Sequence, residues 1–189
     1  MPSNNISRNF FLNYFDDYKK HISCDKNVIK NLLLLKKKIT DCKKNNKKIL
    51  IFGNGGSSAI ASHFAVDLSK NIKIKCLNFS DSSMITCFSN DFGYKNYISN
   101  IVDIYGDNGD MIILISSSGM SENIINAVKK TRVKFSNIVT FSGFSKKNKL
   151  SKLGDINFYV DSKIYNFVEN IHQLWLLSVI DSIFLKYRK

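Results

Sequence analysis

The stretch from Ile49 to Ser69, ILIFGNGGSSAIASHFAVDLS, constrains the fold more than any other part of the chain. It begins with the apolar run ILIF, stops at the glycine turn GNGG (residues 53–56) and passes at once into a helix-compatible segment. A buried strand, a glycine turn and a helix in immediate succession are typical of α/β proteins that bind anions. Glycines let the backbone adopt positive φ, and the free N–H groups of a first helical turn favour a phosphate.

A second stretch, Ile112–Asn123 (IILISSSGMSEN), repeats this order of elements with hydroxyl side chains around a single glycine. One serine at a helix start is usually a cap, but a run of serines after a buried strand exceeds what capping requires. Hydroxyl and backbone N–H groups can bind a phosphate without any arginine. Asn123 is expected either to contact a sugar or to stabilise the turn. The predicted phosphate-binding residues are Gly55, Gly56, Ser57, Ser116, Ser117, Ser118 and Ser121.

Strand-like and helix-like segments alternate along the rest of the chain. The strand-like segments are rich in Ile, Leu and Val without polar alternation, which is typical of strands buried on both faces. This alternation implies right-handed crossovers and a parallel sheet of about five strands in an α/β fold. The expected strands are 47–53, 73–79, 111–116, 137–143 and 156–160, and the expected helices are 57–70, 81–89, 93–105, 121–133 and 165–187.

Two helices are expected before the first strand. Residues 6–20 place aromatic side chains at i, i+4 spacing, and residues 25–44 form a second amphipathic pattern. Together they carry more apolar surface than one sheet face covers, so we expect them to pack partly under the sheet and partly against another subunit. The chain, 1–189, is predicted to be a single domain, with helices in 1–46 and the core and C-terminal helix in 47–189.

Features that would indicate a membrane or secreted protein are missing from the sequence. Apolar runs stay below the roughly 18 residues that a membrane span needs, and the N-terminus has no signal-peptide pattern. Scattered cysteines in a domain of this size predict reduced, mostly buried thiols and a cytoplasmic protein. The cysteines are Cys24, Cys42, Cys76 and Cys87.

The formal net charge is +13, but only Arg8, Arg132 and Arg188 among the basic residues are arginines. Arginine is the preferred phosphate fork and base reader of nucleic-acid-binding proteins. We therefore interpret the lysines as solvated surface and expect no nucleic-acid partner. The charge should still draw anionic metabolites toward the protein.

The first glycine turn departs from nucleotide-binding patterns. It lacks the third glycine of GxGxxG, and no GK[ST] follows it. Asp81, after the second expected strand, could imitate the acid that binds a ribose, but the missing glycine outweighs it. No nucleotide cofactor is expected.

Two pairs of titratable residues share helix faces. His63 and Asp67 are four residues apart. His63 also follows Ser57 by six residues, about 9 Å along a helix, which is near the span of a phosphosugar. A purely structural histidine fits this spacing equally well. Glu169 and His172 are three apart in an otherwise apolar helix, where they need partners or a cavity, and this favours a functional role.

Four motifs carry a family resemblance and occur in the family's order: GNGGSSAIASHFAVDL, FSDSSMITCFSNDFGY, ISSSGMSEN and VENIHQLWLL. From its first helices to its C-terminus, the chain resembles the SIS-domain phosphosugar proteins, specifically the phosphoheptose isomerase group. The resemblance implies a flavodoxin-like three-layer αβα sandwich in a homotetramer, with active sites where N- and C-terminal helices pack between subunits. It also implies interconversion of sedoheptulose 7-phosphate and D-glycero-D-manno-heptose 7-phosphate for lipopolysaccharide or capsule.

The resemblance also assigns roles to single residues. Asn54 and Asp81 fall at substrate-contact positions, and His63 matches a histidine that can ligate zinc. Ser117 stands where the family often has Thr. The serines that match phosphate-binding positions of the family are Ser57, Ser116, Ser118 and Ser121.

Three positions depart from the family's pattern. Asp67 stands where the family's helix has a catalytic Glu, which shortens the carboxylate arm by one methylene. If His172 is aligned with the histidine of the family's QExH segment, Glu169 replaces a metal-binding Gln. Leu177 then stands where the family has a histidine that is both catalytic and metal-binding.

An aldose–ketose isomerase needs a base, an acid at the carbonyl oxygen and fixed substrate geometry. We expect Glu169 or Asp67 as the base, and His172 or His63 as the acid. These four side chains are also ligands of suitable type for zinc. The alternative is a non-catalytic SIS protein, either a phosphosugar sensor or a tetramer that binds a replication initiator. The absence of the expected histidine at Leu177 favours this alternative.

Overall fold

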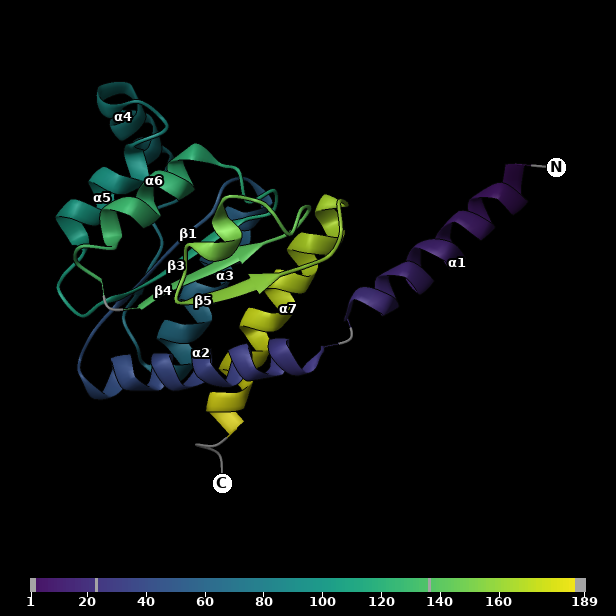
Figure 1. Ribbon diagram of the computed structural model, residues 1–189, viewed down its shortest axis with the longest axis horizontal. Helices are drawn as coiled ribbons and strands as arrows, with labels where there is room; N and C mark the ends of the chain where they lie inside the picture. The colour runs from purple at the N-terminus through teal and green to yellow at the C-terminus, as the bar shows by residue number, and fades with distance from the viewer. Residues whose placement is uncertain (1–2, 23, 136, 186–189) are drawn as a thin grey trace.

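A parallel sheet of five strands forms the centre of the molecule, and helices cover both of its faces (Figure 1). The computed structural model describes residues 3–22, 24–135 and 137–185. The strand order β2-β1-β3-β4-β5 is flavodoxin-like, so the predicted fold class is confirmed. The strands are β1 (Ile49–Phe52), β2 (Cys76–Leu77), β3 (Met111–Ser116), β4 (Asn137–Ser142) and β5 (Ile156–Tyr159).

The helices lie close to the segments expected from the sequence. One difference is that the helix expected over 57–70 changes from α to π geometry at Leu68 and stops before Lys73, which has a φ of +60°. The helices are α1 (Ser3–Ile22), α2 (Lys26–Lys44), α3 (Gly56–Asp67), the π-helical η1 (Leu68–Ile72), α4 (Ser82–Phe92), α5 (Tyr97–Tyr105), α6 (Glu122–Thr131), the 3-10 segment η2 (Leu150–Lys152) and α7 (Tyr165–Phe184).

Successive side chains of β3 point to opposite faces of the sheet, as the pleat of a strand requires, and so pack against the two different helical layers. Met111, Ile113 and Ile115 pack with α2, α3 and α7, whereas Ile112 and Leu114 pack with α5 and α6. All five side chains are fully buried. Burying a side chain of this size contributes about 1.5–3 kcal/mol, so both faces of the strand need apolar residues.

The chain leaves β1 and β3 toward opposite edges of the sheet. β1 connects through α3 to β2 on one side, and β3 connects through α6 to β4 on the other. Neighbouring strands whose connections diverge in this way leave a crevice at their carboxyl ends, the usual ligand site of an open α/β sheet. The two predicted phosphate loops, residues 53–57 and 116–121, begin at the ends of these strands.

Two glycines allow the loops to adopt their shapes. A Cβ added to Gly53 would lie 2.5 Å from the carbonyl of Ser57, so glycine lets α3 start directly against the end of β1. Gly119 has a φ of +65°, and a Cβ added there would collide with the Asn148 side chain. Both positions therefore require glycine for backbone reasons.

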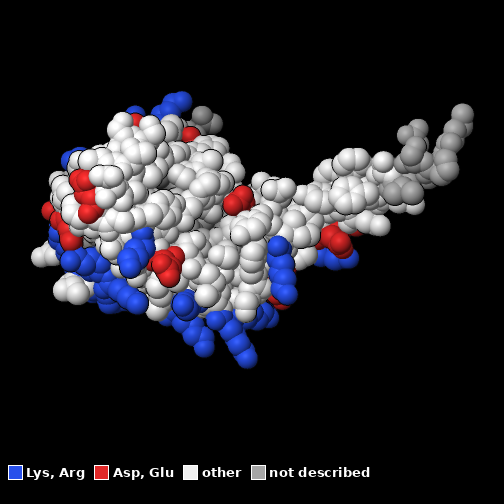
Figure 2. Space-filling model, turned by 90° about the horizontal axis from the view of Figure 1, so that it is seen from above, with Lys and Arg blue, Asp and Glu red and all other residues white. Residues whose placement is uncertain are grey.

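The two N-terminal helices differ in how they meet the sheet. α2 packs beneath it and buries Leu35, Ile39 and Cys42, which confirms the expected packing for this helix. α1 projects from the body and contacts α7 through its second half, where the ring centroids of Tyr14 and Phe167 are 4.8 Å apart (Figures 1 and 2). Large apolar side chains of α1 face solvent with 54% to 60% exposure: Phe10, Phe11, Leu12 and Phe15.

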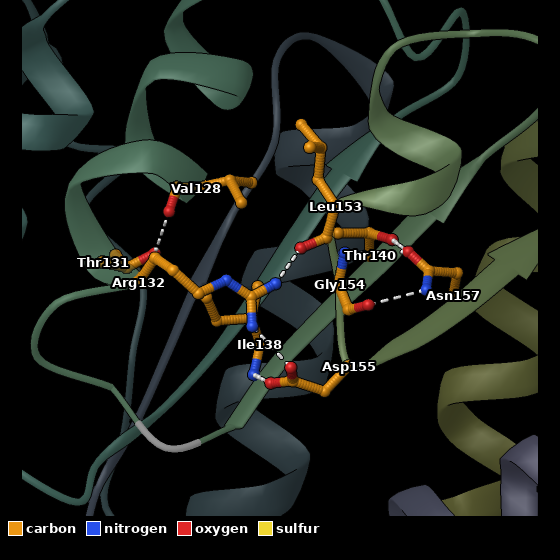
Figure 3. Close-up of polar contacts among 9 residues, drawn as sticks. All are labelled: Val128, Thr131, Arg132, Ile138, Thr140, Leu153, Gly154, Asp155 and Asn157. Carbon is orange, nitrogen blue, oxygen red and sulfur yellow. Dashed lines mark hydrogen bonds and ion pairs between the residues drawn. The ribbon is translucent and has the colours of Figure 1, made fainter.

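Polar contacts join the end of α6 to the β4–β5 edge of the sheet (Figure 3). Arg132 pairs with the Asp155 carboxylate and donates to the Leu153 carbonyl. Asp155 also accepts a hydrogen bond from the Ile138 N–H at 2.7 Å. These residues lie at the amino ends of β4 and β5, opposite to the two predicted loops, and therefore stabilise the fold.

The four cysteines divide evenly between core and surface. Cys42 and Cys76 are buried, whereas Cys24 and Cys87 are exposed, so the expectation of mostly buried thiols holds for two of the four. Burial raises the pKa of the Cys42 thiol to about 11. Within the described ranges, the structure contains no helix that is long and apolar enough to cross a membrane.

Candidate functional site

The two predicted loops face each other across a cavity of about 260 Å³ at the carboxyl ends of β1 and β3. We call the loop residues 53–57 and 116–121 the cradle. Tyr165 and Glu169 of α7 also line the cavity. The structure thus brings together all the residues predicted to bind phosphate, namely Gly55, Gly56, Ser57, Ser116, Ser117, Ser118 and Ser121.

Four serine hydroxyls of the cradle lie against one another in two pairs, whereas Ser118 Oγ accepts a hydrogen bond from the Met120 N–H at 3.2 Å. Ser57 Oγ is 3.4 Å from Ser117 Oγ, and Ser116 Oγ is 3.0 Å from Ser121 Oγ. Ser121 is the N-cap of α6 but makes no side-chain capping bond, and the N-cap of α3 is Gly55. Capping therefore does not account for these serines. Two helix starts with positive dipole ends meet several hydroxyls here, an arrangement suited to an anion.

Glu169 supplies the only charged side chain among the described residues that line the cavity, and no Lys or Arg is among them. Its Oε1 accepts a hydrogen bond from Ser117 Oγ at 3.3 Å. A Cβ added to Gly56 would collide with Oε2, so the carboxylate lies directly over the first residue of α3. An anion in the cradle would therefore be held by hydroxyls and helix dipoles, without a cationic side chain.

A reciprocal pair of side-chain amides joins the two loops. Asn54 Nδ2 donates to Asn123 Oδ1 at 3.0 Å, and Asn123 Nδ2 donates to Asn54 Oδ1 at 2.9 Å. The Tyr94 hydroxyl also donates to Asn54 Oδ1, at 3.0 Å. Asn123 is 2% exposed, so its placement supports stabilisation of the turn over contact with a sugar. Tyr94 was not predicted, although it ends the second family motif, FSDSSMITCFSNDFGY.

His63 and Asp67 form a pair where α3 meets α7. His63 Nε2 is 3.2 Å from Asp67 Oδ2, and the Gln173 amide nitrogen is 3.1 Å from His63 Nδ1. An amide nitrogen can only donate, so the ring proton lies on Nε2, toward Asp67. Gln173 was missed by the sequence reasoning. The available signal was its position one turn after Glu169 on the same face of α7.

His172 lies in the core, away from the cradle. Its side chain is fully buried, its Nε2 is 3.1 Å from the Ser142 carbonyl oxygen, and its ring packs edge-on against Phe141. Burial lowers the pKa of His172 to about 4, and the hydrogen bond to Ser142 opposes this shift only in part. The placement does not support the predicted role as an acid or metal ligand, because the i, i+3 step from Glu169 turns this side chain toward the sheet.

Asp81 and Leu177 both make contacts that stabilise the fold. Asp81 is the N-cap of α4 and accepts hydrogen bonds from the Ser83 and Met84 N–H groups at 2.9 and 3.2 Å. It does not line the cradle, so its predicted contact with substrate is not supported. Leu177 is partly buried and packs against the core between α7 and the sheet.

The four residues predicted as zinc ligands do not come together in one chain. His63 and Asp67 are adjacent, but Glu169 lies at the cradle and His172 is enclosed in the core. Among the residues that the structure describes, no group of three or more His, Cys, Asp or Glu side chains could hold a metal ion. Protein zinc sites use three or four protein ligands, so the side chains of a single chain do not fit zinc.

A parallel sheet in flavodoxin-like order, with glycine and serine loops at its switch point, defines a doubly wound α/β protein whose loops are arranged to suit an anion. The sequence model of one family, the SIS domain, matches residues 13–143. This span includes both loops of the cradle and the His63–Asp67 pair, but ends before Glu169 and the rest of α7.

Comparison with individual relatives identifies the group within this family to which the chain belongs. A phosphoheptose isomerase from Fusobacterium nucleatum is 36% identical over 143 residues, which cover 72% of this chain and 73% of that protein. One from Histophilus somni is 32% identical over 166 residues, covering 84% and 82%. The chain therefore belongs to the SIS-domain family and, within it, to the phosphoheptose isomerase group. A phosphoheptose isomerase structure from Francisella tularensis shares the fold, with a TM-score of 0.81 at 24% identity, covering 97% of this chain and 98% of that one.

Proposed function

We propose that the protein is a phosphosugar isomerase that interconverts sedoheptulose 7-phosphate and D-glycero-D-manno-heptose 7-phosphate, a precursor of surface polysaccharides. One observation carries the proposal: α3 begins at the cradle and bears the His63–Asp67 pair further along. Ser57 and His63 are six residues apart, about 9 Å along the helix, so a phosphate in the cradle would leave the reactive carbons near this pair. The relatives named phosphoheptose isomerase support a heptose as the sugar.

The reaction moves a proton between neighbouring carbons of the sugar. Asp67 acts as the base that takes a proton from C1 of the ketose, while His63 gives its Nε2 proton to the carbonyl oxygen on C2. Asp67 then returns a proton to C2 of the enediol, and His63 Nε2 takes the proton of the C1 hydroxyl, which completes the aldose and restores both side chains. Gln173 holds the imidazole in the tautomer that this step requires, through its contact with Nδ1.

Glu169 is assigned to the phosphate end of the site. Its carboxylate is hydrogen-bonded to Ser117 and lies over Gly56, whereas Asp67 is paired with the imidazole that would serve as the acid. Of the two carboxylates expected as the base, the geometry therefore favours Asp67.

The proposal includes assembly into a homotetramer. The exposed aromatic side chains at the N-terminal half of α1, such as Phe11 at 57% exposure, form an apolar surface that further copies of the chain would bury. Light scattering after size-exclusion chromatography should give four times the chain mass of 21.6 kDa. A monomer at micromolar concentration would contradict this part of the proposal.

The catalytic part is tested by turnover in deuterated water. Incubation with sedoheptulose 7-phosphate, followed by NMR, should show solvent deuterium on C2 of the aldose product. Asp67→Asn should slow this incorporation by about 100-fold or more, because the base is lost. Asp41→Asn removes the same charge from an exposed pair with Lys37 on α2 and should keep the wild-type rate. An unchanged rate in Asp67→Asn would refute the assignment.

A non-catalytic phosphosugar-binding protein is the second candidate. The observation that favours it is Leu177, which is partly buried against the core where the family has a catalytic histidine. The same NMR experiment separates the two candidates. Binding of sedoheptulose 7-phosphate with no deuterium incorporated, at any enzyme concentration up to that of the sugar, would identify a binding protein.

A further inference from the structure

Glu169 places a carboxylate inside the cradle. Ser117 donates a hydrogen bond to one carboxylate oxygen at 3.3 Å, and the other oxygen lies against Gly56 at the start of α3. This is the position where the positive end of a helix dipole and the serine hydroxyls favour an anion. In this structure the anion at that position is the protein's own side chain.

Within one chain, the described lining of the cavity does not offset a second negative charge. None of the described residues that line the cavity is a Lys or an Arg, and the remaining lining side chains are uncharged. A phosphate that enters the cavity must therefore replace Glu169 as the hydrogen-bond acceptor of Ser117. It then remains close to the displaced carboxylate. Coulomb's law, even with the dielectric constant of water, gives about a tenfold loss of affinity for a dianion about 5 Å from a carboxylate.

A sugar phosphate can recover this loss through the hydroxyls of its carbon chain. The displaced carboxylate is an acceptor on a flexible side chain, and the hydroxyls along a sugar chain are donors that can reach it. Gln173, one turn along α7, leads from Glu169 toward the His63–Asp67 pair, so the carboxylate borders the path that a sugar chain would follow. Inorganic phosphate places no carbon-chain hydroxyls on that path.

We propose that Glu169 is a specificity-determining residue, a built-in competitor for the cradle that selects hydroxylated phosphate esters against inorganic phosphate. This inference rests on the proposed function, because it takes the cradle as the phosphate site of a sugar phosphate. Glutamine at this position would keep the side-chain size and an oxygen for Ser117, but would remove the charge that repels phosphate.

The test compares two dissociation constants by isothermal titration calorimetry. The probes are inorganic phosphate and the heptitol 7-phosphate obtained by borohydride reduction of sedoheptulose 7-phosphate, which cannot isomerise. In Glu169→Gln, the ratio of the phosphate constant to the heptitol phosphate constant should fall about tenfold relative to wild type. Glu169→Ala should lower the ratio similarly, whereas Asp41→Asn should leave it unchanged. Thermal unfolding verifies that each variant is folded.

An unchanged or larger ratio in Glu169→Gln would overturn the inference, as would a fall seen only in Glu169→Ala, because space and not charge would then be responsible. The outcome is separate from that of the proposed function. A shifted ratio without isomerisation of sedoheptulose 7-phosphate would refute only the isomerase. Isomerisation with an unshifted ratio would refute only the role of Glu169. If neither probe bound to wild type or to any variant, both proposals would be refuted.

Discussion

Acid should destabilise the fold through His172, and the size of the effect follows from the burial of this side chain. The pKa of His172 falls from 6.5 to about 4 on folding because the charged ring would lose its water. Between these two values the unfolded chain binds a proton that the folded chain does not. Stability is therefore complete above pH 6.5 and decreases as the pH falls toward 4. At about 1.4 kcal/mol per pKa unit, the loss reaches roughly 3 kcal/mol near pH 4.

The surroundings of the ring explain why the core cannot accept the proton. Its neighbours are Phe141, Trp175 and the Ser142 carbonyl, and none of these groups titrates. His172 Nδ1 is buried and has no hydrogen-bond partner among the described residues. Protonation there would bury a charge without a counterion, which a protein core does not tolerate.

The assay is urea unfolding at pH 7.5 and pH 4, at one protein concentration, followed through the fluorescence of Trp175. His172→Gln is the matched variant, because its amide can still donate to the Ser142 carbonyl but does not titrate. Other groups titrate alike in both proteins, so wild type should lose roughly 3 kcal/mol more than the variant over this range. Equal losses in the two proteins would refute the reasoning.

Three further perturbations have defined outcomes. Gly119→Ala should cost about 1–2 kcal/mol of stability, because φ is +65° and the new Cβ meets Asn148. It should also abolish phosphate binding measured by calorimetry, and normal binding would contradict the assignment of the cradle as the phosphate site. Asn123→Ala should cost about 1–3 kcal/mol in urea unfolding, since it leaves the Asn54 amide without its reciprocal partner; a neutral effect would show that the amide pair is dispensable. Phe15→Asp should shift the mass measured by light scattering toward the monomer, because this exposed side chain of α1 would lie in the subunit contact; an unchanged mass would place the contact elsewhere.

Much of the fold could be predicted because its strands, turns and helices leave local signals in the sequence. β3 is buried on both faces and reads as an unbroken apolar run, and the glycine turn after β1 marks a strand that passes directly into a helix. The change to π geometry at Leu68 leaves no such signal.

The candidate site was predictable where neighbours in sequence are also neighbours in space. The cradle consists of two short loops, so its serines and glycines could be identified from the chain alone. Spacing within a helix cannot reveal which face meets the sheet, and His172 therefore looked equivalent to Glu169 until the orientation of α7 was known. The helix face of α7 could have singled out Gln173, but its contact with His63 joins residues 110 positions apart and has no signal in the sequence.

The described walls of the cradle carry no cations. The attraction of anions over a distance and their binding at contact therefore depend on different parts of the molecule. The net charge of +13 acts on anions over distances comparable with the Debye length, about 8 Å at physiological ionic strength, and is weakened by salt. The hydroxyls and helix starts of the cradle act only at contact. Added salt should thus slow the arrival of a phosphorylated ligand far more than it hastens its departure. Ionic strength would govern how often this protein meets its ligand, while the geometry of the cradle sets how long the two stay together.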